Sequence, residues 1–171
     1  EERYAAAGVP QPVIHYLIRR GGAQLVDTVV AGASADLKRA CFFFGERVKG
    51  LRRSGAGVSS IDAYGWTDLF AMAEREPVLW EAADELVRWM AENPHHGIGV
   101  YTSAAGLGKR PDNWRDQVAR WVAETELGHP DGSDDQRVRF LLGIAMNELR
   151  GRVPAVDVED EIRREMGAKH D

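Results

Sequence analysis

The stretch of sequence that decides the fold runs from residue 133 to residue 149 and reads SDDQRVRFLLGIAMNEL. Ser133 and Gln136 have the spacing of a capping box, in which two side chains bond the free backbone groups at a helix N-terminus. After this cap, apolar residues recur every three or four positions, as on the buried face of an α-helix: they are Val138, Leu141, Leu142, Ala145, Met146 and Leu149. We therefore predict a central core helix that ends before Gly151.

Helical spacing continues outward from this stretch, and alternating strand-like runs are nearly absent. One further predicted helix covers residues 35–53, and its apolar face is formed by Leu37, Cys41, Phe44, Val48 and Leu51. Another covers residues 77–93, and its apolar face is formed by Leu79, Ala82, Ala83, Leu86 and Met90. Residues 94–110 contain four glycines, which disfavour a helix, so we predict a Gly-rich loop there. The expected fold is all-α: one domain over residues 1–171, built as a bundle of about six to eight helices.

Composition narrows the class of protein. The chain has 171 residues, a net charge of −5 and one cysteine, which excludes an internal disulfide framework and a thiolate zinc cluster. It contains no apolar run near the length of about 20 residues that a membrane span needs. We expect a cytoplasmic protein without membrane contact. The negative net charge also argues against a protein that binds nucleic acid over its whole surface.

Positive charge is nevertheless concentrated between Lys38 and Arg53, where six basic residues stand against the single acidic residue Glu46. On a regular helix of about 100° per residue, most of these charges share one flank with an aromatic ring. A basic face with an aromatic ring can hold phosphates and stack a base. The predicted nucleic-acid-binding residues are Lys38, Arg39, Phe42, Lys49, Arg52 and Arg53. The alternative is a solvated face whose charges pair with the acidic segments 74–92 and 157–165.

Arg88 and His95 are separated by six residues. This spacing resembles the short motif of HEPN-family ribonucleases, helical domains that usually act as dimers. The resemblance implies that Arg88 and His95, or His96, would polarise a phosphate and assist attack by the ribose 2′-hydroxyl. It covers eight residues, and Trp89 stands where the family often has a polar residue. The alternative is a surface arginine followed by a loop histidine.

The remaining patterns predict neither a metal site nor a cofactor. Glu126 and His129 have the Glu-x-x-His spacing of di-iron bundles, but Gly128 and Pro130 disfavour the helix that such a site needs. The Gly-Leu-Gly-Lys run at 106–109 lacks the flanking residues of a phosphate-binding P-loop. Cys41 lies within an apolar stripe, so we expect an inert core thiol.

These observations favour a non-enzymatic helical subunit or adaptor of a larger cytoplasmic assembly. Its partner would be another protein or a second copy of the chain, and its basic helix would contact nucleic acid. We assign no catalytic residue to this function. Two alternatives stay open: a HEPN-like ribonuclease that uses Arg88 and His95, and a stand-alone protein-interaction module with a merely solvated basic face.

Overall fold

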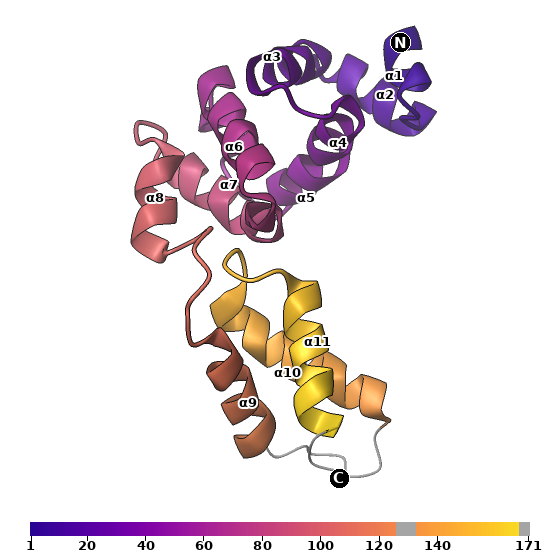
Figure 1. Ribbon diagram of the computed structural model, residues 1–171. Coiled ribbons are helices and arrows are strands. Elements are labelled where there is room, and N and C mark those ends of the chain that lie inside the picture. The colour runs from indigo at the N-terminus through magenta and orange to yellow at the C-terminus, as the bar shows by residue number, and fades with distance from the viewer. Residues whose placement is uncertain (126–132, 168–171) are drawn as a thin grey trace. The chain divides into compact units, whose positions relative to one another are not determined.

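The computed structural model describes residues 1–125 and 133–167, which form helices and connecting turns without any strand (Figure 1). The prediction of an all-α fold is confirmed, although helices α1 to α11 exceed the six to eight expected. Within these ranges, no helix is both long and apolar enough to cross a membrane. The chain divides into two compact units, so the single domain over residues 1–171 stays a prediction.

The N-terminal unit comprises Glu1–Pro77 and Ala83–Ala104. Its elements are α1 (Glu2–Ala6), α2 (Gln11–Arg19), α3 (Ala23–Ala33), α4 (Leu37–Phe42), the π-helical turn η1 (Phe43–Arg47), α5 (Val48–Arg53), the 3-10 turn η2 (Val58–Ser60), α6 (Ala63–Arg75), α7 (Ala83–Glu92) and α8 (Ile98–Ala105). Its core contains an aromatic cluster. The ring of Phe43 lies edge to face on the ring of Phe70, with 5.1 Å between the ring centroids, and the ring of Phe44 stacks on that of Phe70 at a centroid distance of 5.7 Å. These rings fix the segment from α4 to α5 against α6.

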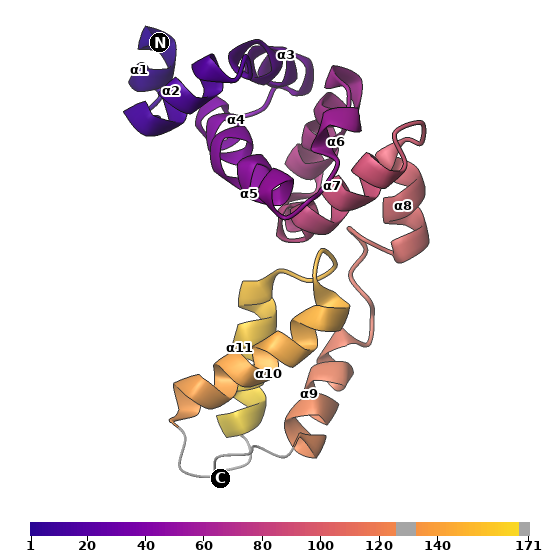
Figure 2. The same cartoon turned by 180° about the vertical axis from the view of Figure 1, so that it is seen from behind.

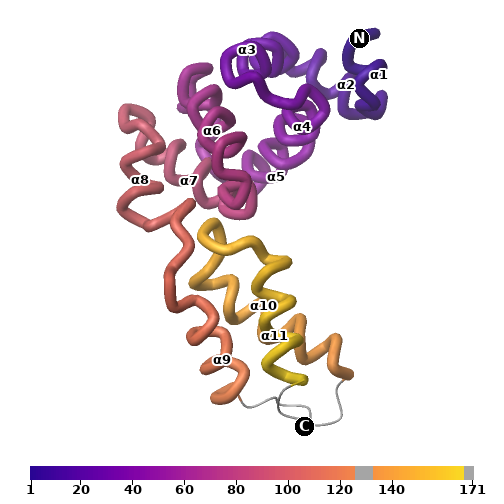
Figure 3. The backbone as a smooth tube through the Cα atoms, in the orientation of Figure 1, coloured from indigo at the N-terminus to yellow at the C-terminus, as the bar shows by residue number. Residues whose placement is uncertain are grey.

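The predicted helix over residues 35–53 is continuous but not regular. Figure 3 shows the trace running from α4 through η1 into α5 without a break. A π-helical turn holds an extra residue, which rotates everything after it about the helix axis. The residues of α5 therefore do not follow the 100° spacing counted from Leu37.

Gly45 lies at the middle of this π-helical turn and brings it close to α2. A Cβ atom at Gly45 would lie 2.6 Å from Cγ1 of Val13, a separation that side chains essentially never show. Gly45 and Val13 are both buried. A glycine is thus required at this position for α2 to approach the turn.

Helix α8 occupies a large part of the segment 94–110, where we predict a loop, and that prediction is wrong for residues 98–105. The reason is the placement of the glycines. Only Gly99 lies inside the helix, whereas Gly97 precedes it and Gly106 ends it with a φ of +66°. Ile98 and Thr102 are buried, and their packing outweighs the low helix propensity of one glycine.

The C-terminal unit comprises Val78–Ala82 and Ala105–Asp171. It contains part of the 3-10 turn η3 (Pro77–Ala82) and the helices α9 (Trp114–Glu124), α10 (Asp134–Leu149) and α11 (Ala155–Gly167), which pack against one another (Figure 2). The predicted capping box is present, with the Ser133 backbone N–H donating to Oε1 of Gln136 at 3.1 Å. In α10 the predicted core residues Leu141, Ala145 and Leu149 are buried, while Leu142 is half-buried.

Segment 78–82 joins the C-terminal unit through two close contacts. The backbone N–H of Ala155 donates to Oε1 of Glu81 at 2.9 Å. Gly151 has a φ of +71°, and a Cβ atom there would lie 2.8 Å from Cβ of Ala82. Both the backbone conformation and the close approach require glycine after α10.

Candidate functional site

Two of the cations between Lys38 and Arg53 are paired with carboxylates of the acidic segment 74–92. Arg39 donates to Oε1 of Glu74 at 2.7 Å, and Arg47 donates to Asp84. Both acceptors belong to the acidic segment 74–92, as the solvated-face interpretation predicts. The pairs are exposed, so each contributes at most about 1 kcal/mol, but they direct this positive charge toward α6 and α7.

Two other cations of the basic helix lie against α2. The Nζ atom of Lys49 lies 4.9 Å from the ring centroid of Tyr16, and Nη1 of Arg52 donates to the Tyr16 hydroxyl at 3.3 Å. Lys49 also lies 3.9 Å from Oε2 of Glu46. These two residues thus contact α2, whereas Arg39 pairs with Glu74 on α6. The structure therefore gathers Lys49 and Arg52 around an aromatic residue that the sequence analysis did not select.

A pocket of about 180 Å³ opens beside this group, and we call it the α2/α5 pocket. Tyr16, Arg20 and Arg52 carry polar groups into its lining, and both arginines are exposed to solvent. None of its lining residues, which all lie in the described range 16–66, is acidic. Its apolar lining is formed by Leu17, Leu25, Phe44, Val48, Val58, Ile61 and Trp66. The pocket thus combines a cationic edge with an apolar floor.

The other predicted site residues lie elsewhere on the N-terminal unit. Lys38 lies near the turn between α1 and α2, where a Cβ atom at Gly8 would be 3.4 Å from its Nζ atom. Phe42 is 37% exposed and does not line the α2/α5 pocket. Arg53 is exposed at the end of α5. Their contact with nucleic acid stays a prediction, and Arg53, four residues after Lys49 in α5, shares a face of that helix with it.

Sequence reasoning missed Tyr16 and Arg20. A signal for Arg20 was present, because the pair Arg19-Arg20 precedes Gly21-Gly22, and basic residues followed by glycine are typical of a helix C-terminus. Such a pair adds a second cationic segment beside the one at 38–53. Nothing in the sequence, however, indicates that α2 would pack beside α5.

The structure places Arg88 and His95 in different surroundings. Arg88 donates to the Ser54 hydroxyl at 2.8 Å. His95 lines a separate pocket of about 130 Å³. The described residues that line it come from 61–68, 90 and 93–98, and Arg88 is not among them.

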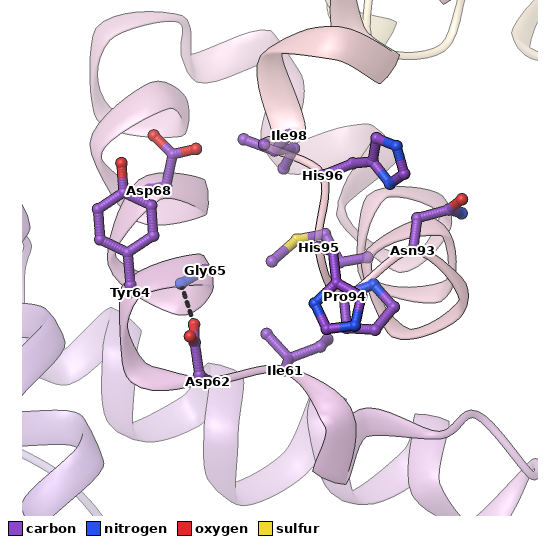
Figure 4. Close-up of a pocket in the computed structure, with 12 residues that line it drawn as sticks. Ile61, Asp62, Tyr64, Gly65, Asp68, Asn93, Pro94, His95, His96 and Ile98 are labelled. Atoms are coloured by element: carbon purple, nitrogen blue, oxygen red, sulfur yellow. Dashed lines mark hydrogen bonds between the residues drawn. The ribbon is translucent and has the colours of Figure 1, made fainter.

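We call this second cavity the His95 pocket. Figure 4 shows Tyr64 and Asp68 on one side of it and Asn93 and His96 on the other. Asp62 also lines it and accepts a hydrogen bond from the backbone N–H of Gly65 at 2.8 Å. Two carboxylates beside the histidines disfavour the approach of a phosphate.

The other chemical groups of residues 1–125 and 133–167 offer no further site. Cys41 is buried, and burial is the main reason why the pKa of its thiol rises to about 11. Among the residues that the structure describes, no three His, Cys, Asp or Glu side chains form a group that could hold a metal ion. The Glu126–His129 pattern lies outside the described residues.

No protein-family model, curated protein or solved structure matches this chain. Its function must therefore be inferred from its own residues.

Proposed function

We propose that this chain is a helical subunit or adaptor without enzymatic activity of its own, and that it binds nucleic acid through Arg20, Lys49 and Arg52. The observation that carries the proposal is the α2/α5 pocket, where two exposed arginines and a tyrosine hydroxyl meet and no acidic residue lines the cavity. An anion approaching this edge meets donors from two different helices.

The chemistry of these side chains suits phosphate groups. A guanidinium donates in a planar fork that matches two phosphate oxygens, and the Tyr16 hydroxyl supplies a further donor. Lys49 adds a charge at Tyr16 without entering the lining of the pocket. Because the chain as a whole is acidic, a localised cationic edge supports a defined contact rather than general coating of nucleic acid.

Exposed apolar side chains support the subunit or adaptor part of the proposal. In the C-terminal unit, Phe140 on α10 is 53% exposed and Val156 on α11 is 62% exposed. Large apolar groups in water favour contact with another protein surface. The N-terminal unit exposes such side chains as well, since Tyr64 is 77% and Val100 59% exposed, so either unit can meet the protein partner.

The test is the binding of a fluorescein-labelled, mixed-sequence DNA single strand of about 15 nucleotides, followed by fluorescence anisotropy over a range of salt concentrations. Three cations at phosphates predict that log K falls against log salt concentration with a slope near −2, at about −0.7 per phosphate. The double variant R20E/R52E should lose at least about tenfold in affinity, while the matched double reversal R120E/R139E, at exposed arginines of α9 and α10, should not. Absence of binding near 50 mM salt, or equal binding by R20E/R52E, would contradict the proposal.

The ribonuclease alternative is tested with the same pure protein. Incubation with a labelled RNA single strand should leave the strand intact. Reproducible cleavage that disappears in both R88A and H95A would replace the non-enzymatic proposal by the HEPN-like one.

A further inference from the structure

The lining of the α2/α5 pocket is divided between charge and apolar surface. Arg20 and Arg52 are exposed, whereas Trp66 is 2% exposed and Phe44 is also buried. A phosphate needs hydrogen-bond donors on all sides and would find none on the apolar floor. A flat apolar group attached to a phosphate would match both parts of the lining.

The size of the pocket sets how much of a ligand can enter. Its volume of about 180 Å³ lies below the range of about 300 to 1,000 Å³ that is usual for sites enclosing a whole small molecule. One ring system can enter, but its sugar and phosphates must stay outside. Arg20 and Arg52 line the pocket and are exposed to solvent, so their guanidinium groups can reach phosphates there.

Polar groups in the lining can meet the edge of such a ring. The Tyr16 and Ser59 hydroxyls each donate and accept hydrogen bonds, and the arginines donate. Nucleobases carry both acceptors and donors on their edges, and their faces are apolar enough to lie against aromatic and aliphatic side chains.

We infer that the α2/α5 pocket takes one unstacked base of a single strand while Arg20 and Arg52 hold the neighbouring phosphates. This inference rests on the proposed function and names its substrate class. A base within a duplex is paired and stacked, and it can enter such a pocket only after it leaves the helix. The chain should therefore prefer single strands to duplexes of the same sequence.

The experiment compares three fluorescein-labelled DNA probes by anisotropy at the same salt concentration: a single strand of mixed sequence, its duplex, and a single strand of equal length with abasic sites throughout its centre. The duplex and the abasic strand should each bind at least about fivefold more weakly than the intact single strand. The abasic strand should keep the salt dependence of the intact strand, because the phosphate contacts remain.

A variant tests the pocket itself. Ser59 is exposed on η2, so S59W can place an indole at the pocket without burial of a new polar group. S59W should weaken binding of the intact strand to the level of the abasic strand, while the matched control S103W, at an exposed serine of α8, should not. The comparison of the abasic strand with the intact strand uses the unaltered protein, so it tests the pocket even if S59W fails to fold.

The outcomes separate the two proposals. Equal binding of all three probes, with loss of binding in R20E/R52E, would overturn the base pocket and leave the phosphate contacts in place. Failure of every probe to bind would overturn the proposed function and this inference with it.

Discussion

Replacement of Gly45 by alanine should strain the N-terminal unit. A Cβ atom at this position would lie 2.6 Å from Cγ1 of Val13, whereas ordinary contact begins at 3.4 Å. Val13 cannot easily turn away, because a β-branched side chain has few rotamers and this one is buried. Either α2 or the π-helical turn must move by most of an ångström.

Gly50, five positions later in α5, offers a matched control. A Cβ atom at Gly50 would meet nothing within 4 Å. Alanine at an exposed helical position is more favourable than glycine by about 0.8 to 1 kcal/mol, so G50A should raise the free energy of unfolding by that amount. In G45A the higher helix propensity of alanine raises the free energy of unfolding by a similar amount, but overpacking against Val13 lowers it by about 1 to 3 kcal/mol. The difference between the two variants, about 1 to 3 kcal/mol, isolates the strain.

Urea unfolding followed by circular dichroism measures this difference, since both variants lie in the same unit and share the same reference protein. G45A should unfold at a lower urea concentration than G50A, with G50A above the unaltered protein. If G45A proved as stable as G50A, the close packing of α2 on the π-helical turn, and with it the position of Tyr16 beside α5, would be refuted.

Three further predictions concern the core and the titrating groups. L141A should lower the free energy of unfolding by about 2 to 4 kcal/mol in urea titrations, and L142A by about 1 kcal/mol, because Leu141 is buried and Leu142 half-buried; equal losses would contradict the orientation of α10. Cys41, whose pKa is raised to about 11, should react with Ellman's reagent at pH 8 far more slowly in the native protein than in urea, and equal rates would show an accessible thiol. The hydrogen bond from Tyr101 to Glu85 is the main reason why the Tyr101 pKa rises from 10.0 to about 12. The folded protein therefore holds this proton more tightly, so the stability it supplies is complete below pH 10 and is lost as the pH rises toward 12. Urea unfolding at several pH values should show a smaller loss over that interval in Y101F, and an unchanged loss would exclude this contribution.

The parts of the fold that could be predicted are those encoded over a few neighbouring residues. The capping box of Ser133 and Gln136 and the stripe through Leu141 and Leu149 depend on spacing within one helix, and both are present. The acidic partners of the basic helix were also foreseeable, since Glu74 and Asp84 lie in the segment that the solvated-face interpretation names.

The parts that could not be predicted depend on contacts between distant segments. The π-helical turn brings Gly45 close to Val13 on another helix, and no spacing of residues within 37–53 predicts this contact. The pocket lined by Tyr16, Arg20 and Arg52 forms only because α2 lies beside α5, and the sequences of these two helices do not predict that they are neighbours. Tertiary packing likewise overrides the local glycine content in α8.

The discontinuous make-up of the C-terminal unit bears on the order in which the protein folds. The hydrogen bond between Ala155 and Glu81 joins positions 74 apart, and a contact over that separation forms only after a long loop has closed. The intervening residues 83–104 belong to the N-terminal unit. A fragment that begins at residue 105 would therefore lack Glu81 and Ala82, which contact Ala155 at the start of α11 and Gly151 in the preceding turn.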